Sequence, residues 1–313
     1  MPTRRALVAG LAFGLAAVTA PFGAFAQEKL PVVASFSILG DFARQVGGDR
    51  VSVTTLVGPD GDAHVYSPTP ADAKAMAAAR LVLVNGLHFE GWLPRLVKSS
   101  GTKATMATAT KGITPLEAGD DHDEKGKGGH AHAHGHDDPH AWQSVANAKI
   151  YVANIKDALS AADPAGKASY EANATAYLAE LDKLEGEVKA AVARIPAQRR
   201  KAIATHDAFS YFVKAYGIAF VAPQGVSTEA EASARDVARI IRQVKAQKIP
   251  AVFLENVTNP RLVEQIARES GAKVGGRLYS DALSAESEPA GTYIRMMKHN
   301  ISEIEKALAA GPA

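Results

Sequence analysis

The chain has 313 residues, enough for two domains of ordinary size, and its 35 basic and 33 acidic side chains leave a formal net charge of +2. No basic block interrupts this near-neutral balance, so binding to nucleic acid or to a charged membrane surface is not expected. The sequence contains no cysteine, which excludes disulfides and thiolate metal sites and predicts that no lipid is attached through a cysteine.

Residues 1–26 have the layout of a secretory signal peptide. Arg4 and Arg5 form a positive start, an apolar stretch covers 6–20, and the sequence AFA offers a cleavage site near Ala26. A transmembrane anchor is the alternative, but the apolar stretch is too short for one. The arginine pair also leaves the twin-arginine export route open. Without this segment the chain has 33 basic and 33 acidic residues, and we expect a soluble periplasmic protein if the source is a two-membrane bacterium.

Residues 27–163 alternate short β-rich runs with helix-like runs, which predicts an N-terminal α/β lobe with a mostly parallel sheet. The expected strands cover 32–36, 51–57 and 81–85, and the expected helices cover 41–46, 70–79, 92–98 and 141–159.

The same alternation returns in residues 197–313 and predicts a C-terminal α/β lobe. The expected strands cover 202–205, 218–221, 251–255 and 272–276, and the expected helices cover 208–216, 234–247, 261–270 and 292–309.

A single long helix is predicted for residues 164–196, between the two lobes. Asp163 can cap this helix, Pro164 suits its first turn, and Pro196 ends it. Inside it, apolar residues recur at three- and four-residue steps and form one stripe. Such a helix is about 45 Å long, longer than one small lobe, and is expected to act as a rigid linker along both. An ordinary helix within one lobe stays open as the alternative.

Residues 117–138 are rich in Gly, Asp, Glu, Lys and His and are expected to form a mobile loop, because almost none of them can enter a core. Alternating histidines on a flexible chain can bind zinc-like ions, but only loosely, since nothing fixes the imidazole rings. A solvated linker without a metal role is the alternative. The auxiliary ligands expected in this loop are His122, His130, His132, His134 and His136.

A selective metal site needs ligands on rigid elements, and in parallel α/β sheets ligands bind beyond the carboxyl ends of the strands. His64, His206 and Asp281 each follow a predicted strand, while His140 ends the mobile loop, is expected to arrive with it, and starts the next helix. Three imidazoles and one carboxylate form a sound tetrahedral zinc shell. Two further histidines, at 88 and 299, lie outside this pattern and are interpreted as structural.

Several segments together resemble the periplasmic solute-binding proteins of zinc and manganese ABC importers, the group that includes ZnuA and TroA. The resemblance extends in order over nearly all of the chain after residue 26. The segments that carry it read LVGPDGDAHVYSPTPAD (56–72), LVLVNGLHFEGWL (81–93), DDPHAWQSVANAKIYVANI (137–155), THDAFSYFVKAYGI (205–218), VSTEAEASARDV (226–237), LYSDALS (278–284) and TYIRMMKHN (292–300).

The resemblance implies two lobes joined by a long helix, with one metal held between them. It assigns His64 and His140 to the N-terminal lobe and His206 and Asp281 to the C-terminal lobe as metal ligands. It also implies a carrier, not an enzyme, that docks on an ABC permease driven by an ATPase. We expect this carrier to be a monomer, and a periplasmic zinc chaperone is a further partner that the sequence leaves open.

Zinc is the expected metal, because three nitrogen ligands favour zinc over manganese and a histidine-rich loop resembles the zinc-specific members. Manganese carriers in this group often have glutamate where this chain has His206. A manganese or dual zinc and manganese carrier is the alternative. Two other classes stay open: a zinc-buffering protein that uses the loop, and a zinc hydrolase with Asp207, Glu229 or Glu231 as general base. A closed site of four protein ligands argues against the hydrolase, as does the absence of an H-E-x-x-H motif.

Overall fold

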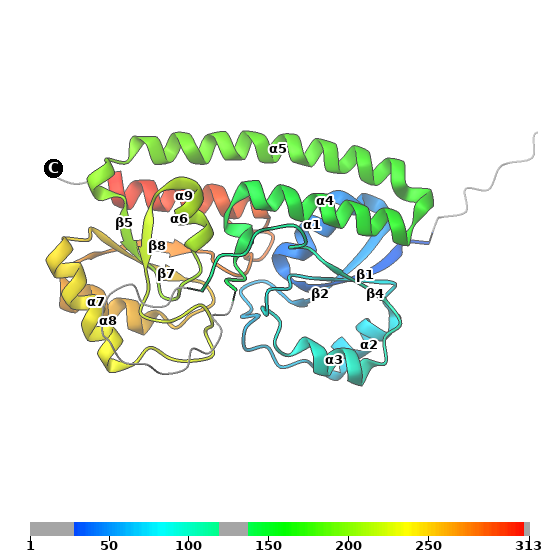
Figure 1. Ribbon diagram of the computed structural model, residues 1–313, viewed down its shortest axis with the longest axis horizontal. Helices are drawn as coiled ribbons and strands as arrows, with labels where there is room; N and C mark the ends of the chain where they lie inside the picture. The colour runs from blue at the N-terminus through cyan, green and yellow to red at the C-terminus, as the bar shows by residue number, and fades with distance from the viewer. Residues whose placement is uncertain (1–27, 119–136, 310–313) are drawn as a thin grey trace, which may run out of the picture.

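Each half of the chain forms a four-stranded parallel sheet, and the two sheets lie side by side in two lobes (Figure 1). The computed structural model describes residues 28–118 and 137–309. The strand orders are β2-β1-β3-β4 and β6-β5-β7-β8, so the second lobe repeats the topology of the first. This arrangement confirms the predicted fold class of two α/β lobes with a long helix.

The N-terminal lobe is built from four strands and three short helices before the gap in the described residues. They are β1 (Leu30–Phe36), α1 (Ser37–Gly47), β2 (Val51–Val57), α2 (Pro70–Ala78), β3 (Leu81–Val84), α3 (Leu93–Ser100) and β4 (Thr105–Thr108). The capping box of α2 shows how local sequence starts a helix: the Thr69 hydroxyl accepts from the Asp72 N–H, and the Asp72 carboxylate accepts from the Thr69 N–H.

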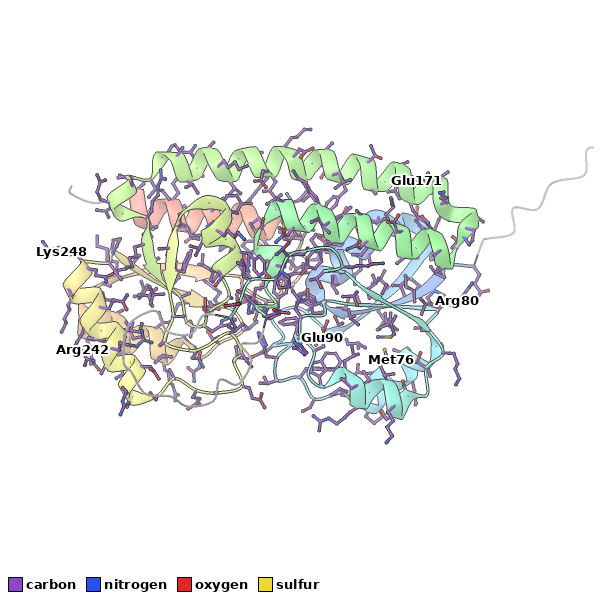
Figure 2. All side chains as sticks on the ribbon, in the orientation of Figure 1. Met76, Arg80, Glu90, Glu171, Arg242 and Lys248 are labelled. Carbon is purple, nitrogen blue, oxygen red and sulfur yellow. The ribbon has the colours of Figure 1, made fainter. Side chains whose placement is uncertain are left out.

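The C-terminal lobe has the same alternation. It contains β5 (Lys201–Ile203), α6 (Ser210–Tyr216), β6 (Ala219–Val221), α7 (Ala234–Gln247), β7 (Ala251–Glu255), α8 (Pro260–Ser270), β8 (Lys273–Leu278) and α9 (Tyr293–Ala309). In Figure 2 the labelled Arg242 and Lys248 lie at the outer end of this lobe, whereas Glu90 of the other lobe lies near the place where the two meet.

Two helices follow, α4 (Val145–Ala162), which packs against α1, β3 and β4 of the N-terminal lobe, and α5 (Lys167–Arg194), which connects the lobes. The second runs along both lobes in Figure 1 and packs against α1 and α4 at one end and α9 at the other. Its apolar stripe is buried, as the sequence predicts, and contributes to one core that includes residues of both lobes. The stripe consists of Tyr170, Ala174, Tyr177, Leu181, Leu184, Val188 and Val192, with Ile195 just past the helix end. This shared core joins the lobes along one side.

The start of the long helix differs from the sequence expectation. A separate 3₁₀ turn, Pro164–Gly166, precedes α5, which begins at Lys167. The side chain of Asp163 makes no capping hydrogen bond. Its carboxylate instead accepts from the Tyr170 hydroxyl at 2.7 Å and pairs with the Arg50 guanidinium at 2.8 Å. The carboxylate therefore binds a cation from the turn before β2 and a phenol of α5.

The strand β4 is absent from the sequence-based prediction, because its four residues are mostly exposed and form no apolar run. All the strands that were predicted from the sequence are present, with ends shifted by up to two residues. The predicted signal peptide, 1–26, and most of the predicted loop, 117–138, lie outside the described residues. Among the described helices, none combines the length and apolar character needed to cross a membrane.

Candidate metal centre

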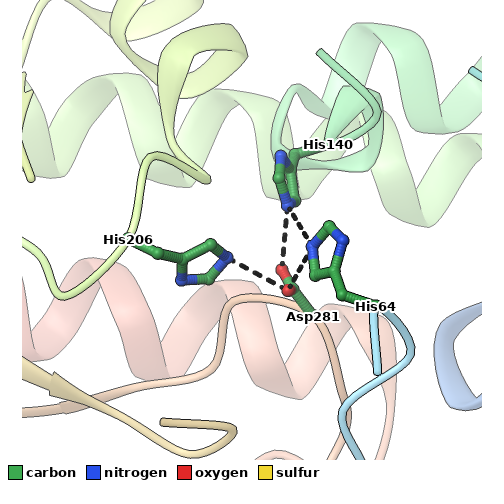
Figure 3. A group of neighbouring side chains, drawn as sticks. All are labelled: His64, His140, His206 and Asp281. Atoms are coloured by element: carbon green, nitrogen blue, oxygen red, sulfur yellow. Dashed lines mark hydrogen bonds and ion pairs between the residues drawn. The ribbon is translucent and has the colours of Figure 1, made fainter. Parts of the chain in front are cut away.

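Four predicted ligand residues meet where the two lobes face each other (Figure 3). His64 follows β2, His206 follows β5 and Asp281 follows β8, while His140 stands just before the 3₁₀ turn Ala141–Gln143 that leads into α4. Each lobe therefore supplies two side chains. Their candidate ligand atoms all lie within 4.8 Å of one another.

The distances within the cluster are those of a coordination shell. The His64 Nε2 atom is 3.3 Å from His140 Nε2 and 3.3 Å from Asp281 Oδ2. The His206 Nε2 atom is 3.1 Å from Asp281 Oδ2, and His140 Nε2 is 3.5 Å from Asp281 Oδ1. Ligands bound at 2.0–2.2 Å around a tetrahedral ion are about 3.4 Å apart. One divalent cation therefore fits between these atoms.

His64 is positioned by the turn after β2. The backbone N–H of His64 donates to Asp62 Oδ1 at 2.9 Å, and the Trp92 indole N–H donates to the Ala63 carbonyl at 2.8 Å. The imidazole packs edge-on against Phe89, with ring centroids 4.8 Å apart. Its side chain is 6% exposed, while those of the other three ligands are fully buried. His64 is thus the ligand on the solvent side of the cluster.

His140 is held from several directions. The carboxylate of Asp138 lies 2.8 Å from His140 Nδ1 and also accepts the His140 backbone N–H at 2.9 Å. The segment is fixed by the Asn85 amide, which donates to the Pro139 carbonyl at 2.9 Å, and by the Tyr211 hydroxyl, which donates to the Asp138 carbonyl at 2.9 Å. His140 is therefore tied by hydrogen bonds to residues of both lobes, and its arrival with the loop stays a prediction.

Glu255, the last residue of β7, orients His206 as Asp138 orients His140. Its Oε1 atom accepts the backbone N–H groups of Thr205 and His206 at 2.6 and 3.1 Å. Its Oε2 atom lies 2.5 Å from His206 Nδ1. With Nδ1 facing a carboxylate, Nε2 is the nitrogen that faces the cluster, which is the usual arrangement for a metal-binding histidine.

Asp281 is fixed through its neighbour. The Ser280 carbonyl accepts from the Trp142 indole N–H at 2.8 Å and from the Gln143 amide at 2.7 Å. The Asp281 carboxylate directs both oxygens at the histidines, and Oδ1 is buried with no hydrogen-bond partner among residues 28–118 and 137–309. A buried carboxylate oxygen without a donor is costly, and a bound cation relieves that cost.

The charges of the cluster also suit a cation. Burial lowers the pKa of His64. For His140, burial opposes protonation, but the charges of Asp281 and Asp138 outweigh it and raise the pKa to about 9. The pKa of His206 is likewise raised, by Glu255 and Asp281, against the effect of burial. Burial alone would raise the pKa of Asp281, yet the two imidazolium neighbours hold it well below its usual value. Without metal, protons on His140 and His206 therefore balance the buried carboxylates, and a divalent cation would replace them.

The remaining candidates do not join the cluster. His88 lies exposed on a turn with a positive φ of 62°, and the His299 ring lies 3.0 Å from the Arg277 carbonyl oxygen. Asp207, whose pKa is raised by burial, accepts from the Ser210 hydroxyl. Two further candidates for a general base, Glu229 and Glu231, are exposed. The predicted loop ligands at 122, 130, 132, 134 and 136 lie outside the described residues.

Sequence reasoning did not assign roles to Asp138 and Glu255. A signal exists for Asp138, which stands two residues before His140. For Glu255 the only signal is an acidic residue at the end of an apolar strand, AVFLE. Both carboxylates orient a histidine of the cluster, and outer partners of this kind tune metal affinity.

Two parallel α/β lobes bridged by a long helix, with a buried group of metal-type ligands between them, define a metal-binding substrate-binding protein of the ABC-importer type. The sequence matches the family described as "ZnuA: Zinc-uptake complex component A periplasmic" over residues 32–307. The chain belongs to this family, whose members are periplasmic metal-binding components of ABC importers, act with a permease and an ATPase, and are not enzymes.

Individual relatives are named for different metals. The manganese-binding lipoprotein MntA of Halalkalibacterium halodurans is 36% identical over 283 residues, which cover 90% of this chain and 89% of that protein. The iron-binding protein YfeA of Yersinia pestis is 34% identical, over 89% of this chain and 86% of that protein. The solved structure of the periplasmic zinc-binding protein TroA from Treponema pallidum aligns with a TM-score of 0.82 at 29% identity, over 90% of this chain and all of that one.

Proposed function

We propose that this protein captures Zn²⁺ between its lobes and delivers it to an ABC permease, with His64, His140, His206 and Asp281 as the four ligands. The observation that carries the proposal is the convergence of three imidazole nitrogens and one carboxylate in a buried cluster. Nitrogen-rich shells favour zinc over manganese in the Irving–Williams order, and four protein ligands close a tetrahedral site.

Manganese is the second candidate, because the relative MntA is named for manganese. The relative YfeA is named for iron, so similar proteins differ in their metal. One structural feature also favours manganese. The two oxygens of Asp281 both face the histidines, at 3.1 to 3.5 Å, so the carboxylate could bind through both and raise the coordination number for a harder ion. Zinc stays our choice, since His206 supplies a third nitrogen.

Other parts of the proposal rest on the sequence. Residues 1–26 act as a signal peptide, residues 27–163 and 197–313 form the two lobes, and 164–196 link them. The histidine-rich loop gathers ions beside the main site through its auxiliary ligands. The mature protein is a soluble periplasmic monomer, and a zinc chaperone is a candidate source of its metal.

Metal stoichiometry and affinity test the proposal. Purified protein is titrated with Zn²⁺ and with Mn²⁺ in competition with chelators, alongside a variant lacking residues 120–136 and a His206→Ala variant. The carrier proposal expects one tight zinc without the loop, loss of that zinc by orders of magnitude in His206→Ala, and weaker manganese binding throughout. If loop removal abolishes tight binding and His206→Ala does not, the buffering function replaces the carrier. If manganese binds as tightly as zinc, a dual zinc and manganese carrier replaces the zinc-specific carrier.

A further inference from the structure

The turn that carries His64 makes a set of hydrogen bonds to the opposite lobe. The Asp60 backbone N–H donates to the Leu283 carbonyl at 2.8 Å, and the Asn256 amide donates to Asp60 Oδ1 at 3.0 Å. Further along the turn, the Thr228 hydroxyl donates to Asp62 Oδ2 at 2.6 Å. The other oxygen of Asp62 accepts the His64 backbone N–H. One carboxylate therefore connects a metal-ligand backbone to the facing lobe.

Thr228 belongs to a segment that runs beside the backbone of another ligand. The Gln224 N–H donates to the Thr205 carbonyl, and the Asp207 N–H donates to the Gly225 carbonyl, each at 3.2 Å. These two bonds flank His206. The Asp62–Thr228 contact thus joins the chain segment of His64 to the chain segment of His206, across the gap between the lobes.

We propose that Asp62 and Thr228 are positioning residues that hold His64 against the other three ligands and so set the rate at which bound metal leaves the site. The proposal rests on the proposed function, since it assumes a metal in the cluster. The side of the lobes along α5 is closed by the shared apolar core. His64 is the one ligand of the four with an exposed fraction, so the metal leaves on the side where this contact lies.

The surroundings of the contact allow it to open and close. A cavity of about 380 Å³ is lined by Asp62 from one lobe and by Gln224, Thr228 and Thr258, among others, from the other lobe. Water in this cavity can solvate the carboxylate and the hydroxyl when they separate. A hydrogen bond that water can replace contributes only modestly to stability, so its loss should change a rate severalfold without unfolding the site.

The test compares three single substitutions by metal release. Each protein is loaded with Zn²⁺ alone and mixed rapidly with an excess of a chromogenic chelator. Thr228→Val removes the hydroxyl at nearly constant shape and is expected to speed release about two- to tenfold. Thr228→Ser keeps a hydroxyl and should release at close to the wild-type rate. Thr258→Val makes the same chemical change in the same cavity, at a hydroxyl with no hydrogen-bond partner among the described residues, and should leave the rate unchanged.

A double-mutant cycle separates the contact from general loosening of the segment. Asp62→Ala also removes the acceptor of the His64 N–H, so it should speed release more than Thr228→Val. In the Asp62→Ala background, Thr228→Val should have no further effect. Fully multiplicative effects would overturn the proposal, as would a wild-type rate in Thr228→Val or an equal acceleration in Thr258→Val.

Failure of this proposal is distinguishable from failure of the proposed function. A wild-type protein that holds neither Zn²⁺ nor Mn²⁺ overturns both. A wild-type protein that holds either metal, with equal release from wild type and Thr228→Val, overturns the role of Asp62 and Thr228 alone.

Discussion

Replacing Glu255 by glutamine perturbs the site while all four proposed metal ligands stay unchanged. The Glu255 side chain is fully buried, and its carboxylate faces the Thr205 and His206 backbone N–H groups and His206 Nδ1. When His206 binds metal through Nε2, Nδ1 carries a proton. A glutamine side chain has one acceptor oxygen and one donor group. Either orientation of the amide then points a donor at a donor, against the imidazole or against the backbone.

The magnitude follows from that single mismatch. A hydrogen bond to a charged group contributes about 1.5–3 kcal/mol, and removing an outer partner of a metal-binding histidine typically costs 10–100-fold in affinity, which is about 1.4–2.7 kcal/mol. Glu255→Gln is therefore expected to weaken zinc binding by about 10–100-fold. The ligand set itself is unchanged, so one zinc should still bind.

Glu90 supplies the matched control. It is also a buried glutamate that accepts two backbone N–H groups, from Asn85 at 2.6 Å and Gly86 at 3.2 Å, and in addition the Ser35 hydroxyl at 2.6 Å. Its hydrogen bonds include none to a histidine of the cluster in the described part of the chain. Glu90→Gln should lower the thermal midpoint of the metal-free protein, as Glu255→Gln should, while leaving zinc affinity within about threefold of wild type.

Chelator competition at pH 7 measures the affinities, and thermal unfolding of the metal-free proteins measures the stabilities. Wild-type affinity in Glu255→Gln would show that the carboxylate does not orient His206. An equal loss of affinity in both variants would show that the loss comes from general destabilisation. Either result refutes the reasoning.

Three further predictions address the protons, the ligands and the long helix. Because the pKa of His140 is raised to about 9 and that of His206 is also raised, zinc binding at pH 7 should release about two protons, and zinc affinity should rise with pH from 7 to about 9. Calorimetry in buffers of different ionisation enthalpy counts the protons, and a heat that does not depend on the buffer would contradict the prediction. His64→Ala should weaken zinc binding by more than about 100-fold, whereas His88→Ala should bind as wild type does in the same competition assay. Leu181→Ala in the buried stripe of α5 should lower the free energy of unfolding by about 2–5 kcal/mol, measured by denaturant titration of the metal-free protein, and the exposed Lys183→Ala should change it by less than about 0.5 kcal/mol.

The strand that sequence reasoning identifies most directly is also fully buried. Leu81–Val84 is an uninterrupted apolar run with every residue buried, so its composition alone identifies it. The edge strand Thr105–Thr108 carries mostly exposed side chains, and within residues 28–118 and 137–309 it pairs with β3 alone. Its conformation comes from pairing with that neighbour, and this pairing leaves no pattern in the four residues themselves. The role of Asp163 was not predictable for the same reason, because its partners Arg50 and Tyr170 come together only in the folded chain.

Three of the four clustered residues, His64, His206 and Asp281, were predictable because of where strands end. In a parallel sheet the carboxyl ends lie at one edge, so a histidine or aspartate directly after a strand is placed near that edge before the strand order is known. Glu255 was not predictable in the same way. It reaches His206 because β7 lies beside β5 in the sheet, although the two residues are 49 positions apart. Sequence shows the ends of strands, but only the strand order shows which ends are neighbours.

The four proposed ligands differ in how firmly the surrounding residues hold them, and this difference indicates which ligand lets go of the metal first. His140 and His206 each face a carboxylate through Nδ1, and Asp281 is fixed by the double hydrogen bond at Ser280. These three ligands are fully buried and form a preorganised set with members from both lobes. In contrast, no outer carboxylate faces the His64 imidazole among residues 28–118 and 137–309, and the Asp62–Thr228 bond that ties its turn to the opposite lobe is one that water can replace. A rigid set of three ligands with one releasable ligand reconciles tight binding with delivery, because the metal can be held strongly yet leave after only one contact has opened.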